Sequence, residues 1–323
     1  MRAPKGEVSR PRMSPVTVSD SDLAMRFTEH RTHLLGVAYR LTSTLSDAED
    51  AIQEAWLRLS ALDDRARADI RDLRGWLTTV VGRLCLDRLR SAAVRRERYV
   101  GPWLPEPVVT PFGTPTSEDP LDAIVRDDGV RMAALVVLDK LTPEQRVAFV
   151  LHDAFGVPFT EIAATLGCSE ATARQHASRG RRAAADADPP PRAALADQGA
   201  VVQALLAALS AGDLAKVVSL LHPDAVLVGD SDGKARTARN FVVGPDNIAR
   251  FMLGLVKMYG LENLGKSELV LVNGDLAMAI PDIPSDGVHR EVNRRVTAFA
   301  LRDGQVAAIY DIVNPDKLTG YTR

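Results

Sequence analysis

A run of prolines divides the helical part of this chain into two blocks. Residues 99–120 read YVGPWLPEPVVTPFGTPTSEDP and include six prolines and two glycines. Because proline removes a backbone donor and disrupts helices, no regular element is expected here. We therefore predict a linker, although Trp103 and Leu104 are unusual in a segment exposed to water. The blocks on either side are expected to fold as separate units.

The block before the linker, residues 21–98, has a helical pattern. In SDAEDAIQEAWLRL, apolar side chains recur at the spacing of one helix face. In the later segment GWLTTVVGRLCLDRLR, apolar residues form one face, while Arg83, Asp87 and Arg90 lie together on another. The basic end of this helix favours contact with a polyanion such as DNA. A solvated helix face would give the same pattern.

Capping residues indicate where several helices begin. Ser46 and Glu49 have the spacing of a capping box, as do Thr142 and Gln145, with a proline directly after Thr142. The segment LDAIVRDDGVRMAALVVLDKL, residues 121–141, is expected to form one helix ahead of the second of these caps.

The block after the linker, residues 121–186, ends in two helices joined by a short turn. The first ends at Gly167, and Ser169 caps the second. Small alanines lie on the inner face of the second helix, and hydrogen-bonding residues lie on its outer face. Such a helix can pack closely while its outer side chains reach base edges, so we predict a DNA-binding helix-turn-helix. Short patterns of this kind have many false matches, and a solvated basic helix end is the alternative.

The pattern changes after a second break at residues 187–197. ALLAALSAGDLAKVVSLL predicts a pair of helices, AVLVGDSDGKARTA a strand, a turn and a strand, and GPDNIARFMLGLVKMY a helix. Two hairpins are predicted to turn at Asn273 and Asp303, each followed by glycine. Helices followed by antiparallel strands predict an α+β domain over residues 198–323.

Composition limits the function. The net charge is only −2, so DNA contact would have to come from local basic clusters. Cys85 and Cys168 lie far apart and no metal-ligand spacing of Cys and His occurs, so we predict neither a metal nor a cofactor. No apolar run is long enough to span a bilayer, and residues 1–20 are basic without the apolar core of a signal peptide. We expect a cytoplasmic protein with a disordered tail and no membrane partner.

The two helical blocks resemble extracytoplasmic-function sigma factors. FTEHRTHLLGVAYRLTSTLSDAEDAIQEAWLRL with GWLTTVVGRLCLDRLRS looks like region 2 of this family, and LTPEQRVAFVLHDAFGVPFTEIAATLGCSEATARQHASRGRRA looks like region 4. The resemblance implies core RNA polymerase, through its β′ and β subunits, and promoter DNA as partners. It implies that the acidic helix docks on the coiled coil of β′, although its acids also fit an ordinary helix start. The residues implicated are Asp50, Gln53, Glu54 and Trp56.

The resemblance also implies a promoter element for each basic helix. The region 2 helix would read and help open the minus-ten element, and the region 4 helix would read the minus-thirty-five element. Many family members carry an asparagine near Arg83, which this chain lacks. The region 2 residues implicated are Arg83, Asp87, Arg88 and Arg90. The region 4 residues implicated are Ser169, Glu170, Thr172, Arg174, Gln175 and Arg179.

The last block resembles a SnoaL-like domain of the nuclear-transport-factor-2-like fold, a cone in which a curved sheet wraps helices. The resemblance rests on LVGDSDGKAR, IYDIVNPDKLTGY and the linker motif WLPEP, and it points to a subgroup of these sigma factors in which the extension replaces a separate anti-sigma protein. The DGGG-type motif is degenerate here, as DSDG at 230–233. The expected regulatory contacts are Trp103, Leu104, Pro105, Asp230, Asp232, Gly233, Asn314, Pro315, Asp316 and Lys317.

The implied fold is multidomain: two all-α helical sigma domains followed by an α+β SnoaL-like cone domain. The implied function is promoter-specific initiation by a sigma factor that this last domain modulates in cis. The alternative is a DNA-binding regulator fused to a SnoaL-like enzyme or small-molecule sensor, and a ligand of the domain is left open. Acid–base candidates are present but form no evident dyad, so no catalysis is expected. They are Asp230, Asp232, Tyr310, Asp311 and His222, the last expected to cap a helix end.

Overall fold

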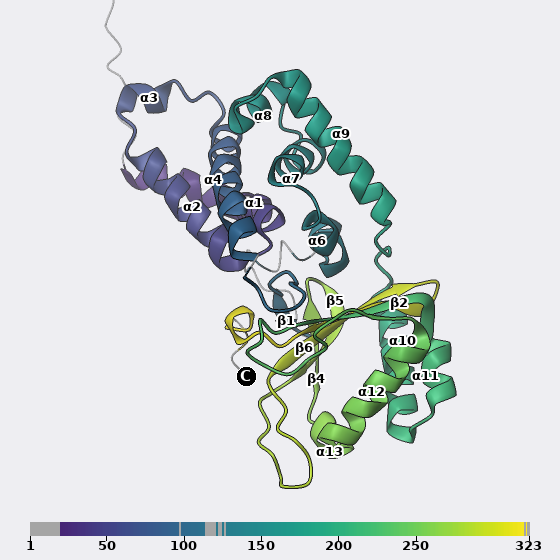
Figure 1. The fold of residues 1–323 in the computed structure, drawn as a ribbon. Coiled ribbons are helices and arrows are strands. Elements are labelled where there is room, and N and C mark those ends of the chain that lie inside the picture. The colour runs from purple at the N-terminus through teal and green to yellow at the C-terminus, as the bar shows by residue number, and fades with distance from the viewer. Residues whose placement is uncertain are drawn as a thin grey trace, which may run out of the picture.

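The computed structural model describes residues 20–96, 98–113, 121, 125, 127–319 and 321. Two groups of helices stand against one face of a sheet, and a third group covers its other face (Figure 1). Nearly all of the predicted disordered tail, residues 1–20, lies outside the described residues. The architecture confirms the predicted order of two helical domains and an α+β domain.

Region 2 is a group of helices packed around one apolar core. The helices are α1 (Asp20–Thr42), α2 (Leu45–Ser60), α3 (Asp64–Ala68) and α4 (Leu73–Arg96). Leu34, Ile52 and Leu77, one from each long helix, are buried together at its centre. The helical periodicity of the sequence is confirmed here, because each long helix turns its apolar stripe inward.

The start of α2 differs from the prediction. Its N-cap residue is Thr44, which makes no side-chain bond to the helix backbone. Instead the linker residue Glu106 accepts a hydrogen bond from the Leu45 N–H at 2.7 Å. The capping box predicted at Ser46 and Glu49 is therefore wrong, because a carboxylate from the linker occupies the helix start.

The block predicted as region 4 contains, from Asp128 onwards, several short helical elements and one longer helix. They are η1 (Asp128–Val130), α6 (Met132–Leu138), α7 (Pro143–Phe149) with its π-helical extension η2 (Val150–Ala154), α8 (Phe159–Leu166) and α9 (Glu170–Ala187). The capping box of Thr142 and Gln145 is confirmed. Gly167 ends α8 in a left-handed conformation with φ 68°, and Ser169 caps α9, as predicted.

The single helix predicted over residues 121–141 is wrong. A 3₁₀ turn precedes α6, and Arg131, between the two, has extended backbone with ψ 149°. The side chain of Asp127 accepts hydrogen bonds at this turn and pairs with Arg40 of α1, so a tertiary contact overrides local helix propensity. Part of this segment lies outside the described residues.

The described strands form one sheet in the order β1-β4-β5-β6-β7-β2-β3. Their bounds are β1 (Val109–Pro111), β2 (Leu221–Asp230), β3 (Val242–Val243), β4 (Glu268–Val272), β5 (Asp275–Ile280), β6 (Arg295–Arg302) and β7 (Gln305–Ile312). Neighbours are antiparallel except for the parallel pair β2 and β7. Both predicted hairpins are confirmed, with Asn273 and Asp303 at φ 53° and 51°.

Two local expectations for strands are wrong. The linker contains a strand after all, because Val109 pairs with Val272 at the edge of the sheet. The second strand predicted directly after the DSDGK turn is not formed, and residues 231–241 run as turns and bends up to β3. The linker, expected to be irregular, therefore contributes an edge strand to the sheet.

Helices cover one face of the sheet and region 4 covers the other. On the first face lie α10 (Leu195–Ala211), α11 (Leu214–Leu220), α12 (Pro245–Tyr259) and α13 (Leu261–Leu264), while η3 (Pro315–Lys317) follows β7. Alternate strand residues such as Phe299 and Ile309 pack against these helices. On the outer face, Tyr310 packs with Leu104 of the linker and Met132 of α6.

Replacing Glu106 tests its role at the start of α2. Glu106→Ala removes the acceptor for Leu45 and is expected to lower the free energy of unfolding by about 1 kcal/mol in urea titration. Burial raises the pKa of the Glu106 carboxyl, so the folded state binds its proton more tightly and stability falls as pH rises through its titration. Glu106→Gln keeps an acceptor without the charge and should be at least as stable as wild type at pH 7. Equal losses in both variants would contradict the capping role.

Candidate nucleic-acid interface and the contacts that cover it

The outer face of α9 is open to solvent. Arg174, Gln175 and Arg179 are exposed, while Ala173 and Ala177 are buried against the rest of region 4. Gly180 was not singled out from the sequence, yet a Cβ there would lie 2.8 Å from the Cβ of Phe149. The helix can therefore approach α7 closely only because this residue is glycine.

The predicted region 4 residues do not all project freely. The Ser169 hydroxyl accepts from the Thr172 N–H at 3.2 Å and so serves the helix start. Arg174 pairs with Glu170 at 2.8 Å and lies over the Phe159 ring. These two side chains support each other along α9 and remain at the surface, where such a pair contributes about 0–1 kcal/mol.

The predicted minus-ten face of α4 meets region 4. Arg83, Asp87 and Arg90 are exposed, but the Arg83 guanidinium donates to the Ala164 carbonyl of α8 at 2.7 Å. Arg90 pairs with Glu144 of α7 at 2.9 Å. Two of the three arginines that the resemblance assigns to minus-ten contact, Arg83 and Arg90, are thus bound to the other helical block.

Regions 2 and 4 share a continuous core beneath these polar contacts. Leu151 packs against Gly82 of α4, where an added Cβ would come within 3.0 Å of it. The Arg146 side chain is 1% exposed and donates to the Arg40 carbonyl at 2.9 Å. Arg88, by contrast, stays within region 2, 4.0 Å from Asp47.

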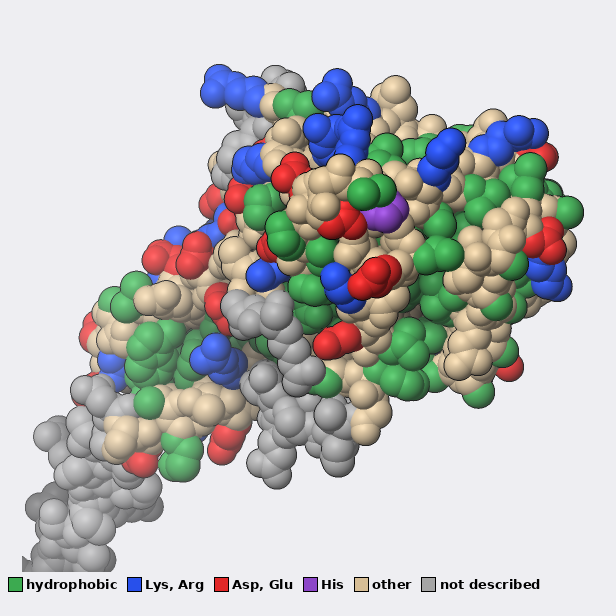
Figure 2. Space-filling view, turned by 90° about the horizontal axis from the view of Figure 1, so that it is seen from below, with side chains coloured by type: hydrophobic (Ala, Val, Ile, Leu, Met, Phe, Trp, Pro, Cys, Tyr) green, Lys and Arg blue, Asp and Glu red, His purple; other side chains and the backbone are tan. Residues whose placement is uncertain are grey.

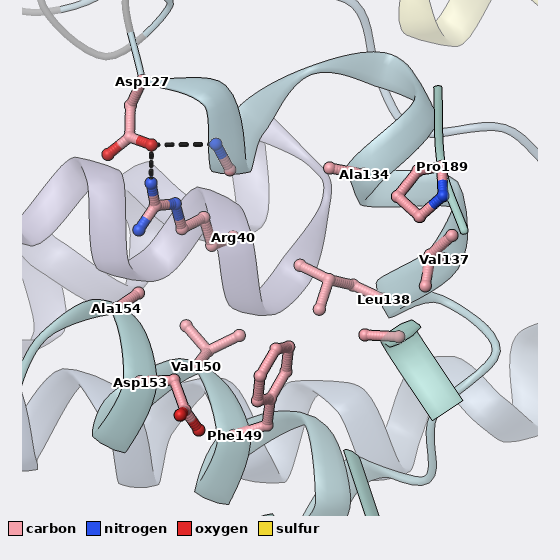
Figure 3. A pocket seen from close by; sticks show the side chains of 12 residues that line it. Arg40, Asp127, Ala134, Val137, Leu138, Phe149, Val150, Asp153, Ala154 and Pro189 are labelled. Carbon is pink, nitrogen blue, oxygen red and sulfur yellow. Dashed lines mark hydrogen bonds and ion pairs between the residues drawn. The ribbon is translucent and has the colours of Figure 1, made fainter. Parts of the chain in front are cut away.

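A cavity of about 410 Å³ marks the seam between α1 and region 4 (Figure 3). Arg40 of α1 and Asp127 pair at one side of it, and Asp127 also accepts from the Gly129 N–H at 2.8 Å. Leu138 and Phe149 point into the cavity from region 4. The two regions are therefore held by polar contacts at the rim and incompletely packed apolar residues within.

Asp50, Gln53 and Glu54 of α2 make no side-chain hydrogen bond or ion pair with another element among the described residues. Asp50 and Gln53 are exposed, and Glu54 is half-buried and pairs with Arg58 of the same helix at 3.1 Å. Trp56 turns inward and packs on Phe27, with ring centroids 5.1 Å apart. The predicted polymerase-docking residues thus divide into an open acidic group and one supporting aromatic ring.

Asp230 is the centre of the contacts around the linker. It is fully buried, and its carboxylate accepts from the Leu104 N–H and from the Lys317 ammonium, both at 2.6 Å. The same ammonium lies 3.9 Å from the centre of the Trp103 ring. The WLPEP motif, the DSDG turn and the NPDKL motif, far apart in the sequence, therefore meet at one carboxylate.

Tyr99 adds to this cluster and was not singled out from the sequence. Its hydroxyl donates to Asp230 and accepts from the Asn314 amide at 2.8 Å. Burial, followed by the Asp230 charge, raises the pKa of Tyr99, so the hydroxyl stays protonated as a donor. Only its position in the linker, close to WLPEP, hints at this role.

The remaining predicted contacts lie around the same turn. Asp232 accepts from the Val100 N–H at 3.2 Å and pairs with Lys234 at 3.2 Å, and Lys234 also binds Asp316. Gly233 has φ 69° and lies directly against Val100. Pro105 is buried in the linker, and Pro315 begins η3. The residues predicted as regulatory contacts therefore lie close together, in the linker and in the two segments of the SnoaL-like block that contact it.

The turn between β4 and β5 makes a second long-range contact. The Asn273 side chain accepts from the Val108 N–H at 3.0 Å and donates to the Tyr39 hydroxyl of α1 at 2.8 Å. Tyr39 in turn donates to the Glu106 carbonyl at 2.6 Å. Sequence reasoning identified Asn273 as a turn residue and missed this bridge between region 2, linker and sheet.

The acid–base candidates do not converge on one site. Asp311 accepts from the hydroxyls of Thr237 and Thr297 at 2.6 and 3.0 Å, on the helix side of the sheet. Tyr310 lies on the opposite face. The expectation that His222 caps a helix end is wrong, because it lies within β2 and accepts from the Asp224 N–H at 3.2 Å.

Charges are mixed over the surface. Seen from below, acidic and basic side chains alternate, with a group of basic ones along the upper edge of the view (Figure 2). Within the described part of the chain, no group of three or more His, Cys, Asp or Glu side chains is arranged to hold a metal ion. None of the described helices has the length and apolar character needed to span a membrane.

Known families match each block of the chain. The family Sigma-70 region 2 matches residues 26–95, the family Sigma-70, region 4 matches residues 131–183, and the SnoaL-like domain family matches residues 202–309. These matches agree with the helical groups and the sheet domain of the structure.

Relatives match along nearly the whole chain. The ECF RNA polymerase sigma factor SigJ of Mycobacterium tuberculosis is 53% identical over 90% of this chain and 91% of its own length. The probable ECF RNA polymerase sigma factor SigI of the same species is 34% identical over 90% and 92%. The crystal structure of SigJ superimposes with a TM-score of 0.77 and 50% identity, covering 92% of this chain and 98% of that one. The chain therefore belongs to the family of extracytoplasmic-function RNA polymerase sigma factors and carries a C-terminal SnoaL-like domain.

Proposed function

We propose that this arrangement is a closed resting form of the sigma factor, in which the SnoaL-like domain and the linker hold regions 2 and 4 together. Binding to core RNA polymerase would separate the two regions and free their DNA-contacting faces for the promoter. The domain limits proposed for these parts are residues 21–98, 121–186 and 198–323. We expect the protein to act in the cytoplasm, where polymerase and promoter DNA are found.

The observation that carries the proposal is the engagement of α4 with region 4. The guanidinium groups of Arg83 and Arg90 are directed at Ala164 and Glu144 of region 4, so a promoter base would have to replace these partners to receive the same N–H groups. Arg90 and Glu144 are both partly exposed, so their pair contributes about 0–1 kcal/mol. This ion pair is thus weak enough for polymerase and DNA to displace, whereas the shared apolar core must be separated by the binding free energy of polymerase.

The linker cluster supplies the connection to the third domain. Asp230 and Lys317 fix the backbone of Leu104, and the Asn273 side chain fixes that of Val108. A linker held at both points keeps the regions at its two ends close to each other. This geometry supports modulation in cis by the SnoaL-like domain.

We assign polymerase docking to Asp50, Gln53 and Glu54, with Trp56 positioning that helix by its packing on Phe27. We assign minus-ten contact to Arg83, Asp87, Arg88 and Arg90. We assign minus-thirty-five contact to the open face of α9, namely Glu170, Arg174, Gln175 and Arg179, with Ser169 and Thr172 ordering the helix start.

A catalytic role for the SnoaL-like domain has no specific support. Asp311 is its best-buried candidate base on the helix side, but its carboxylate already accepts two threonine hydroxyls and pairs with Arg295. A general base needs a free lone pair within reach of a substrate proton. We therefore favour the regulatory function over the tethered enzyme.

In vitro transcription with core polymerase tests the proposal directly. Asp50→Ala with Glu54→Ala removes the open acidic group and is expected to reduce core binding and promoter-dependent transcription at least tenfold, by about 1.4 kcal/mol or more. Asp246→Ala with Glu262→Ala, two exposed acids of the SnoaL-like domain, is the matched control. The intact chain failing to direct any transcription, or the two double variants behaving alike, would contradict the assignment.

Lys317→Ala tests the linker cluster. It leaves Asp230 buried without its cation and is expected to destabilise the SnoaL-like domain by about 3 kcal/mol in urea titration. Adding Asp230→Asn should restore part of this loss, because no unpaired buried charge remains. Both variants free the linker, so transcription at limiting core polymerase should rise above wild type. Lys257→Ala, an exposed lysine on α12, is the control. If the double variant folds and its transcription is unchanged or lower, the contacts around Asp230 do not restrain regions 2 and 4.

A further inference from the structure

We propose that a cavity between region 4 and the outer face of the sheet binds a small molecule with an apolar body and one carboxylate, and that its occupancy stabilises the closed arrangement. The cavity has a volume of about 620 Å³. Cavities of about 300–1,000 Å³ typically hold metabolite- or drug-sized molecules. The predicted effect of the ligand on transcription rests on the closed resting form proposed above. The predicted binding of the ligand does not depend on that proposal.

The walls come from parts of the chain that belong to different domains. The lining includes Val136 and Val137 of α6, Trp103 of the linker, Pro189 after α9, and Val226 and Ala308 of the sheet. Most of this lining is apolar, so a hydrophobic body gains from burial there. Phe241 stands at the cavity with 62% of its surface exposed, an aromatic ring available to cover such a body.

The polar groups of the cavity favour an anion. Lys140 at the end of α6 is exposed and makes no ion pair with any described residue. Arg302 adds a second cation, bound to Asp188 at 2.9 Å. Of the acids that line the cavity, Asp139 is bound to Arg146, and Asp224 is almost fully exposed beside His222. Lys140 is thus the cation of the cavity lining that has no ion-pair partner among the described residues, and we assign it to the anionic group of the ligand.

Tyr310 supplies a hydrogen-bonding group in the lining. Its side chain lines the cavity and is 6% exposed, yet its hydroxyl makes no hydrogen bond with any described residue. A hydroxyl that no described residue engages is available to a ligand oxygen, which can accept its hydrogen bond. One ammonium and one phenol in an otherwise apolar cavity match a carboxylate at the end of a hydrophobic molecule.

This site is distinct from the interior of the cone. The interior has its own cavity of about 460 Å³ on the helix side of the sheet, lined by Phe251, Leu255 and Tyr259. The proposed site lies on the opposite face, where region 4 docks. A molecule bound there touches α6, the linker and the sheet at once, so it binds the closed form better than a form in which these parts separate.

Binding is measured on the full chain by isothermal titration with dodecanoate and 2-naphthoate, with dodecanol as the uncharged comparison. At least one acid is expected to bind and dodecanol to bind at least tenfold more weakly. Lys140→Gln should weaken the acid about tenfold and Tyr310→Phe about fivefold. Val136→Trp, which fills the cavity, should abolish binding. Lys257→Gln on α12 and Tyr259→Phe in the cone interior are the matched controls and should leave affinity unchanged.

Three outcomes would overturn the site. In the first, neither acid binds. In the second, neither Lys140→Gln nor Val136→Trp changes the affinity for the acid. In the third, Tyr259→Phe abolishes binding. Saturating acid is then added to transcription reactions, where it should lower output from the wild type and not from Val136→Trp. Binding without this difference would reject the coupling to the closed form while leaving the site. A wild type that directs no transcription without any ligand would instead reject the proposed function.

Discussion

The buried ion pair between Asp230 and Lys317 is the contact on which the closed arrangement depends. Asp230 is fully buried and Lys317 is 8% exposed, so neither charge is tolerable without the other. A buried pair of this kind adds little net stability compared with an apolar pair, but it specifies one geometry. Here the geometry includes the Leu104 backbone at both its N–H and its carbonyl, which fixes the linker on the sheet.

The position of the linker then determines the position of region 2. Two residues beyond Leu104, the Glu106 carboxylate caps α2 and the Glu106 carbonyl accepts from Tyr39. Further along, β1 joins the sheet edge through Val109. Region 4 is held to the same sheet by Arg131, which pairs with Asp275 at 3.0 Å. Both sigma regions are thus bound to the same sheet. This shared attachment keeps them close together, where α4 of region 2 contacts region 4.

The elements could largely be predicted from the sequence, and their long-range partners could not. Local signals, such as the helix cap at Thr142 and the hairpin turn at Asn273, can be recognised from a few consecutive residues of the sequence. The partner of Asn273 is Tyr39, and the partner of the α2 start is Glu106, so each role is set by residues distant in sequence. The linker was predicted to be irregular from its prolines, but pairing with β4 imposes a strand at Val109. Trp103 and Leu104 were the exception, because apolar residues in a proline-rich linker indicate that something covers them.

The distance between regions 2 and 4 in solution tests the closed resting form most directly. Fluorescent labels on Met25→Cys of α1 and Ser178→Cys of α9, in a Cys168→Ser background, report this distance by single-molecule energy transfer. The closed resting form predicts one compact, high-transfer population for the free chain and a shift to low transfer when core polymerase is added. A free chain that already shows the low transfer of the polymerase-bound form would contradict it.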